Sequence, residues 1–244
     1  MYISLFSGGI SSFESTCRLL DEFPNETRIW FFDTKIEDQD TYRFISDCEI
    51  YFNMKIEIYS DGRNPWQVFR DERYIGNSRI TPCNKLLKRR MLEKKLQEQQ
   101  FDNESIVLVF GISGDEEFRK NRITEGWRRK NVYTKFPLLE NPIYYGQRYE
   151  EFEKKYNLIS PRLYKLGFKH NNCGGACVKA GIKQWIHLYH NFPNIYLWHE
   201  DQEKITRELL QKNVSILRDR NGGITKPLTL EALRRRIELW QTST

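Results

Sequence analysis

Short apolar runs alternate with longer stretches of helical character through the first 140 residues of the chain. Among the apolar runs are YISLF from Tyr2, TRIWFFD from Thr27 and SIVLVF from Ser105. Strands separated by helices of about 10–15 residues are typical of βαβ units, which build parallel sheets. SIVLVF is apolar on both faces, as a strand covered on both sides must be. The pattern therefore predicts an α/β core in which helices cover both faces of a parallel sheet.

The pattern changes near residue 142 and becomes mainly helical. Four stretches after this point have helical character, and the last of them is LTLEALRRRIELW. We therefore expect a core of residues 1–140. A mainly helical region of residues 141–244, which contains the sequence CGGAC, would pack on this core.

The composition is typical of a soluble protein. Charged residues make up 30% of the chain, and its mean hydropathy is −0.70. No apolar run approaches the ~18–20 residues that cross a bilayer, and no signal peptide precedes the first predicted strand. We therefore expect a cytoplasmic protein without a membrane partner, whose five cysteines are reduced thiols or ligands.

The turn after the first predicted strand has the composition of a phosphate cradle. The sequence SGGISS contains two glycines, Gly8 and Gly9, between hydroxyl side chains. In an open parallel sheet, ligands bind beyond the carboxyl ends of the strands. A glycine turn lets the backbone approach a ligand there, and the N–H groups of the next helix attract an anion. The alternative is an ordinary strand–turn–helix with serine capping.

SGGISS resembles the PP-loop, SGGxDS, of the adenine-nucleotide α-hydrolase superfamily. It is most similar to the branch that contains the phosphoadenosine phosphosulfate reductases and the DNA-phosphorothioation sulfurtransferase-like ATPases. Further segments resemble this branch in the same order: FFDTKIEDQDTYRF, NPWQVF, ITPCNKLLKRRML, VFGISGDEEFRKNR and PRLYKLGFKHNNCGGACVKAG. The resemblance covers roughly residues 1–200. It implies a five-stranded, Rossmann-like (HUP-type) sheet that binds ATP or an adenylyl derivative.

The sequence departs from the family pattern in two places. Ser11 replaces the PP-loop aspartate that helps to hold Mg²⁺ in the family, so Asp33, at the end of the second strand, is the best substitute. The reductases also use a cysteine in an ECGIH-like motif, whereas no cysteine follows Cys177. This difference disfavours the reductase reaction.

The loop GISGDEEFRKNR is a second place where the resemblance implies chemistry. Gly111 ends a predicted buried strand, so the residues after it lie on the ligand side of the sheet. Arg119 offers a guanidinium fork for phosphate oxygens. Glu116 offers a carboxylate that orients Mg²⁺ or accepts a proton. The alternative is a helix start with acids in its first turn.

These interpretations define one candidate site for ATP and Mg²⁺. Lys88, on the helix that follows Cys83, is expected to be a second cation at the phosphates. The expected nucleotide-binding residues are Ser7, Gly8, Gly9, Ser11, Ser12, Asp33, Thr34 and Gly111. The expected catalytic residues are Ser12, Asp33, Lys88, Glu116 and Arg119.

Three cysteines are candidates for a metal site. Cys173 and Cys177 flank the glycines of CGGAC, and Cys83 precedes a predicted helix. Thiolates around glycines suit Zn²⁺ or an iron–sulfur cluster. Two alternatives stay open, namely one catalytic thiol with a lowered pKa, or three buried thiols that only pack.

The net charge of +6 is unevenly distributed. Residues 119–135 contain seven basic residues and one acid. Such a stretch fits a phosphate-rich partner such as nucleic acid, and it equally fits a solvated face or an oligomer contact, so a homodimer stays open.

Three functions are compatible with these observations. The first is an adenylating PP-loop enzyme that binds ATP, releases pyrophosphate and serves sulfur transfer in nucleic-acid or nucleotide modification. The second is a phosphoadenosine phosphosulfate reductase-like enzyme. The third is a non-catalytic adenine-nucleotide-binding or sensing module of a phage or defence system, which the replacement of the PP-loop aspartate by Ser11 favours.

Overall fold

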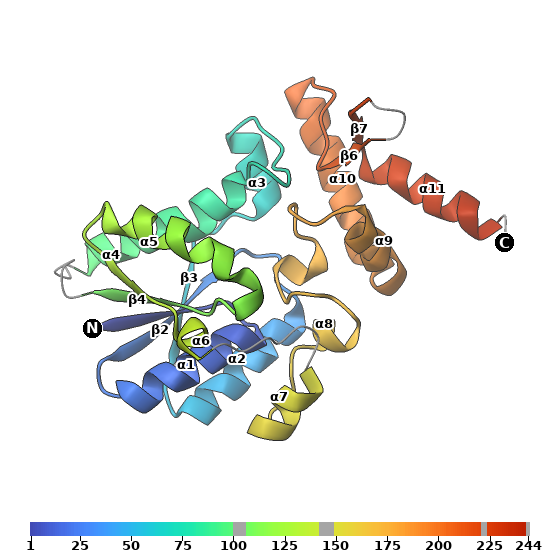
Figure 1. The fold of residues 1–244 in the computed structure, drawn as a ribbon. Coiled ribbons are helices and arrows are strands. Elements are labelled where there is room, and N and C mark those ends of the chain that lie inside the picture. The colour runs from blue at the N-terminus through green and yellow to red at the C-terminus, as the bar shows by residue number, and fades with distance from the viewer. Residues whose placement is uncertain (100–105, 142–148, 221–223, 243–244) are drawn as a thin grey trace. The chain divides into compact units, whose positions relative to one another are not determined.

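The computed structural model describes residues 1–99, 106–141, 149–220 and 224–242 (Figure 1). These residues form two compact units. The first unit comprises residues 1–33, 37–60 and 91–172, and the second comprises residues 34–36, 61–90 and 173–244. The expected division at residues 140 and 141 stays a prediction.

The first unit is built on a parallel sheet of five strands in the order β3-β2-β1-β4-β5. This finding confirms the predicted α/β fold. The order reverses between β1 and β4, and this reversal is the switch point at which open α/β sheets bind ligands. The strands are β1 (Tyr2–Phe6), β2 (Thr27–Asp33), β3 (Ile56–Ser60), β4 (Val107–Phe110) and β5 (Tyr133–Lys135).

Helices cover both faces of this sheet (Figure 1). The helices of this unit are α1 (Ile10–Glu22), α2 (Gln39–Phe52), α4 (Met91–Glu98), α5 (Lys120–Arg128), α6 (Pro137–Glu140), α7 (Tyr149–Tyr156) and α8 (Arg162–Lys165), with the 3₁₀ segment η3 (Gly114–Arg119) before α5.

The alternation of apolar side chains along β2 divides the core into two clusters. Trp30 and Phe32 pack with apolar residues of α4 and α5. Ile29 and Phe31 point to the other face and pack with apolar residues of α1, α2 and α7. Because neighbouring residues of a strand face opposite sides, a strand that is apolar throughout requires helices on both faces.

The second unit is mainly helical. It contains α3 (Pro65–Asp71), the π-helix η1 (Asn84–Arg90), the 3₁₀ turn η4 (Cys173–Gly175), α9 (Ile182–Asn191), α10 (Pro193–Leu210), the antiparallel strands β6 (Leu217–Asp219) and β7 (Lys226–Leu228), and α11 (Leu230–Thr242). A buried hydrogen bond of 2.9 Å from Trp66 Nε1 to His199 Nδ1 joins α3 to α10. None of the helices in the described ranges has the length and apolar character that a bilayer crossing requires.

A buried carboxylate joins α10 to the residues on either side of the strand pair. Glu203 is 1% exposed, and its two oxygens accept hydrogen bonds from the N–H groups of Ile216 at 3.0 Å and Leu230 at 2.7 Å. Burial raises the pKa of Glu203 from 4.5 to about 7. The folded chain therefore holds this proton at pH values where the unfolded chain has released it.

We expect Glu203 to make the protein less stable as the pH rises from about 4.5 to 7. The folded state binds more protons than the unfolded state in this window, so the free energy of unfolding falls there, by an amount on the order of 3 kcal/mol. Urea unfolding at pH 4.5, 6 and 7.5 measures this dependence. The Glu203→Gln variant should lose this part of it, whereas Glu208→Gln, at an exposed position of the same helix, should keep it. Identical pH profiles for the wild type and Glu203→Gln would contradict the prediction.

Candidate functional site

The loop between β1 and α1 has the backbone of a close-approach turn. Gly8 has a φ of +75°, and a Cβ on it would lie 2.5 Å from Thr41 Cγ2. Only glycine adopts such a φ without strain. A Cβ on Gly9 would lie 2.7 Å from the hydroxyl oxygen of Tyr164. Both glycines are therefore required by the protein itself, whatever ligand approaches them.

The hydroxyl of Ser12 is the centre of this loop. It accepts hydrogen bonds from the N–H groups of Ser7 at 3.1 Å and Gly9 at 3.3 Å, and it donates one to the carbonyl oxygen of Gly9 at 2.8 Å. The Ser7 hydroxyl donates to Ser12 Oγ as well, at 3.1 Å. Three donors thus converge on one oxygen at a helix N-terminus, which is also the place where N–H groups bind phosphate oxygens in other proteins.

Gly111 brings the end of β4 against the start of α1. A Cβ on Gly111 would lie 2.6 Å from Ser12 Cα and 2.9 Å from Ser12 N. Backbone therefore packs on backbone at the switch point. Gly111 acts on the loop through this contact, which explains why a glycine is needed there.

Asp33 lies at the end of β2 and is buried. The Tyr42 hydroxyl donates a hydrogen bond to its Oδ1 at 2.9 Å, and the Ser60 hydroxyl donates to its carbonyl oxygen at 3.1 Å. Burial, with the bond to Asp33, raises the pKa of Tyr42. Thr41, beside Tyr42 on α2, contacts Gly8, so Asp33 and the glycine turn share one end of α2. The next residue, Thr34, belongs to the second unit.

The segment η3 carries the two other predicted residues of the first unit. Arg119 and Glu116 form an ion pair in which both side chains are partly exposed. Both charges reach His170, whose pKa is lowered by burial and further by Lys169 and Arg119, against the opposing effect of Glu116. Glu116, Arg119 and the segment around His170 therefore lie close together. Ser11, at the position of the missing aspartate, is only partly buried.

Two residues that the sequence analysis did not single out lie directly at the glycine turn. The Tyr164 hydroxyl oxygen accepts the N–H groups of Ile10 and Asn171, and burial raises the pKa of Tyr164 to about 12. The amide nitrogen of Asn171 donates to the carbonyl oxygen of Gly8 at 2.7 Å and to the Thr41 hydroxyl at 3.0 Å. Their segment, PRLYKLGFKHNN, formed part of the family resemblance, but no spacing rule linked it to Gly8.

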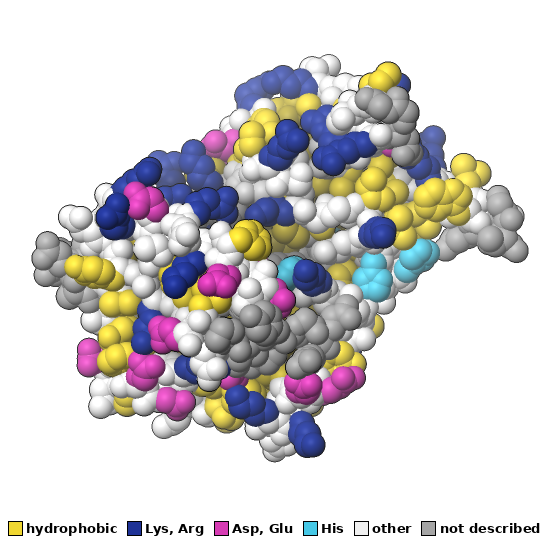
Figure 2. Space-filling view, viewed as in Figure 1, with side chains coloured by type: hydrophobic (Ala, Val, Ile, Leu, Met, Phe, Trp, Pro, Cys, Tyr) yellow, Lys and Arg dark blue, Asp and Glu magenta, His cyan; other side chains and the backbone are white. Residues whose placement is uncertain are grey.

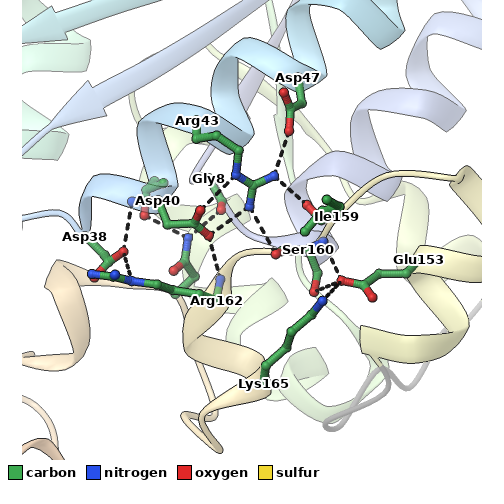
Figure 3. A network of polar contacts seen from close by, with 12 residues as sticks. Gly8, Asp38, Asp40, Arg43, Asp47, Glu153, Ile159, Ser160, Arg162 and Lys165 are labelled. Carbon is green, nitrogen blue, oxygen red and sulfur yellow. Dashed lines mark hydrogen bonds and ion pairs between the residues drawn. The ribbon is translucent and has the colours of Figure 1, made fainter. Parts of the chain in front are cut away.

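A network of ion pairs fixes this segment to α2 (Figure 3). Arg162 binds both oxygens of Asp38, at 2.8 and 2.7 Å. Arg43 binds Asp40 and Asp47 and donates to the carbonyl oxygen of Ser160. Bidentate pairs of this kind fix orientation as well as distance. The network therefore determines where the chain re-enters the site.

The three candidate cysteines all belong to the second unit. Cys173 hydrogen-bonds Cys177, and this bond, the Lys179 N–H and the charges of Lys88 and Lys179 lower the pKa of Cys177 against the opposing effect of burial. Burial, with the charge of Cys177 nearby, raises the pKa of Cys83 to about 11. The structure therefore brings the pair together and places Cys83 within electrostatic reach of it.

A metal site at these cysteines stays a prediction. In the part of the chain that the structure describes, no group of three or more His, Cys, Asp or Glu side chains is placed so that it could hold a metal ion. Lys88 lies on η1 in the second unit, where its charge acts on Cys177. Its predicted place at the phosphates likewise stays a prediction.

We expect Cys177 to be the fastest cysteine to react with iodoacetamide at pH 7. Its lowered pKa favours the thiolate, which is the reactive form, whereas burial raises the pKa of Cys17 to about 12. Mass spectrometry of peptides after short labelling should show at least about tenfold faster modification of Cys177 than of Cys17. Cys173→Ala should slow it, because the thiolate then loses the hydrogen bond that contributes most to its lowered pKa. Equal rates at Cys177 and Cys17 would contradict the prediction.

Comparison with models of known protein families decides the family. Residues 1–170 match the phosphoadenosine phosphosulfate reductase domain. The chain belongs to this family. The matched residues include the glycine turn, Asp33 and the segment η3, whereas Asn171 and the pair of Cys173 and Cys177 follow the match. The predicted family is thereby confirmed, and with it membership of an enzyme family that binds adenine nucleotides.

A curated relative comes from Methanocaldococcus jannaschii, where it is described as an uncharacterized protein. It is 26% identical over 210 residues, which cover 85% of this chain and 42% of the relative. The chain thus spans about two fifths of the length of this relative.

Proposed function

We propose that this protein binds ATP on the loop Ser7–Ser12 and transfers its adenylyl group to a substrate with release of pyrophosphate. The observation that carries the proposal is the convergence of the Ser7 and Gly9 N–H groups and the Ser7 hydroxyl on Ser12 Oγ. These donors lie beside the switch point between β1 and β4, where the family binds its nucleotide. The β- and γ-phosphate oxygens would accept hydrogen bonds from the same donors that Ser12 Oγ engages in this structure.

The other predicted residues complete this site. Gly8 and Gly9 allow the backbone conformation of the turn, and Gly111 lets β4 pack closely against it. Ser11 offers a hydroxyl at the first turn of α1. Asp33 and Thr34 would contact the nucleotide from the end of β2. Oxygen ligands suit Mg²⁺, which one or two carboxylates usually hold together with the phosphates. Asp33 and Glu116 would hold it here, and Mg²⁺ would supply charge neutralisation at the phosphates.

The reaction consists of one displacement at the α-phosphorus of ATP. A substrate oxygen forms a bond to this phosphorus, the bond to the β-phosphate oxygen breaks, and pyrophosphate leaves with the electron pair. Negative charge grows on the departing oxygens, so cations and N–H donors fixed in advance accelerate the step. Arg119 and Lys88 are the proposed cations. A sulfur nucleophile would then displace AMP from the adenylated substrate.

Calorimetry with ATP and Mg²⁺, followed by a pyrophosphate assay with tRNA, DNA or no acceptor, tests the proposal. We expect wild-type protein to bind ATP and to release pyrophosphate with an acceptor. Ser12→Ala should weaken ATP binding, because the loop loses the oxygen that holds it in shape, whereas Ser46→Ala, at an exposed position of α2, should not. ATP binding without release of pyrophosphate, whether tRNA, DNA or no acceptor is present, favours the sensing module. Sulfite released from a phosphosulfate with thioredoxin favours the reductase.

A nucleic-acid partner is the part of the proposal that concerns residues 119–135. Lysine and arginine side chains gather over α4 and α5 (Figure 2). Acidic neighbours already pair with five of the seven basic residues, namely Arg119, Arg128, Arg129, Lys130 and Lys135. We therefore assign the contact to Lys120 and Arg122, beside Phe118, which is 82% exposed and offers a ring on which a base can stack.

We expect binding to single-stranded DNA or tRNA to weaken as salt rises, with a slope of about −0.7 per phosphate neutralised. Gel shifts at two salt concentrations measure this slope. The double variant Lys120→Glu/Arg122→Glu should abolish the shift, and Lys204→Glu, at an exposed position of α10, should preserve it. The absence of any shift at low salt would leave the stretch as a solvated face.

A further inference from the structure

Asn171 lies at the glycine turn and is 3% exposed. Its side-chain nitrogen donates to the carbonyl oxygen of Gly8 at 2.7 Å and to the Thr41 hydroxyl at 3.0 Å. Its own N–H bonds the Tyr164 hydroxyl. Both ends of this residue are therefore held in place, and its side chain is directed at the loop.

The orientation of the Asn171 amide follows from these partners. The carbonyl oxygen of Gly8 can only accept a hydrogen bond, so the amide nitrogen must face it. The amide oxygen, Oδ1, then faces away from Gly8. This oxygen is buried, and among the residues that the structure describes it has no hydrogen-bond partner.

A buried acceptor without a donor destabilises the folded protein, so the chemistry that would satisfy it is informative. Ionised phosphate oxygens carry no proton and would repel Oδ1. The partner must bring an N–H or O–H group. A nucleotide with its phosphates on the adjacent loop carries three such groups, the two sugar hydroxyls and the exocyclic amino group of adenine.

We propose that Asn171 determines which nucleotide the loop accepts, by receiving at its side-chain oxygen a hydrogen bond from a sugar hydroxyl or from the base amino group. The proposal rests on the proposed ATP site and adds a specificity residue to it. The two ends of the amide have separate tasks. The nitrogen donates to the Gly8 carbonyl oxygen and so holds the left-handed turn. The oxygen accepts a hydrogen bond from the nucleotide and so discriminates between nucleotides.

Calorimetry with four nucleotides separates these tasks. ATP is compared with 2′-deoxy-ATP, 3′-deoxy-ATP and inosine triphosphate, each of which lacks one of the three donors. We expect wild-type protein to bind one analogue about tenfold more weakly than ATP, which corresponds to one hydrogen bond of about 1.4 kcal/mol. In Asn171→Leu this tenfold difference should disappear.

Two further variants distinguish nucleotide discrimination by Asn171 from its stabilisation of the glycine turn. Thr41→Val removes one partner of the amide nitrogen and leaves Oδ1 in place, so discrimination should persist. Asn171→Asp keeps an acceptor and loses the donor to Gly8, so it should bind every nucleotide more weakly yet still discriminate, and it replaces Asn171→Leu if the latter does not fold. ATP binding without discrimination by the wild type, or with equal discrimination in Asn171→Leu, overturns this inference alone. No ATP binding by the wild type overturns the proposed function as well.

Discussion

The Gly111→Ala variant should lose about 2–3 kcal/mol of stability, as overpacked sites do, and should bind ATP at least about tenfold more weakly. The added methyl group would lie 2.6 Å from Ser12 Cα. A flexible side chain could move away from it, but the opposing atoms are backbone, so β4 and α1 must separate. Ser12 and the N–H groups of its loop move with α1. Thermal unfolding and ATP calorimetry on the same preparation measure both effects.

Gly181→Ala is the matched control for Gly111. It lies before α9, and a Cβ there would meet no atom of the described residues within 4 Å. It should leave the ATP affinity unchanged and cost no more than about 1 kcal/mol of stability, because Gly181 is the N-cap of α9 and alanine is a poorer cap than glycine. If Gly111→Ala melts and binds ATP like the wild type, backbone packing at the switch point does not position the loop.

Replacing Arg162 by methionine should destabilise the protein by about 2–3 kcal/mol. Removal of one partner of a buried ion pair costs about 3–5 kcal/mol, and the lower value allows for the half-exposed guanidinium. The Asp38 carboxylate, whose side chain is 1% exposed, would keep only the Asp40 N–H as a described donor. Hydrogen exchange should also accelerate at the Asn171 amide, because the segment that bears it loses its attachment to α2.

Two comparisons isolate this pair. Asp38→Asn removes the stranded charge, so the double variant Arg162→Met/Asp38→Asn should be more stable than Arg162→Met alone. Arg235→Met breaks an exposed pair with Glu231 and should cost about 0–1 kcal/mol. A cost for Arg162→Met no larger than that for Arg235→Met would show that the network does not secure the segment.

The sheet and its loop were predictable from the sequence because their signals are local. A strand that is apolar on both faces requires helices on both sides, and a glycine pair after a strand predicts a turn with backbone exposed to a ligand. From the sequence, we expected a glycine at position 8 only because the backbone must approach phosphate there. The structure adds Thr41, which approaches so closely that a Cβ at Gly8 would not fit.

Tyr164 and Asn171 could not be predicted because nothing local connects them with the loop. The hydrogen bond between Asn171 and Gly8 joins residues that are 163 positions apart. It depends on how Asp38 and Arg162 fix the returning chain. Lys88 shows the same limit, since the sequence indicated the helix on which it lies but could not indicate that its charge acts on Cys177.

The Ser12 hydroxyl acts as an internal substitute for a ligand oxygen. Because it already engages the Ser7 and Gly9 N–H groups, the unliganded loop keeps its shape without any anion. At the proposed nucleotide site, an arriving phosphate would exchange one acceptor for another, so these two N–H groups would contribute only the difference between a charged and a neutral partner. Selection at this loop should therefore follow the charge of the incoming group, and association should not wait for the loop to become ordered.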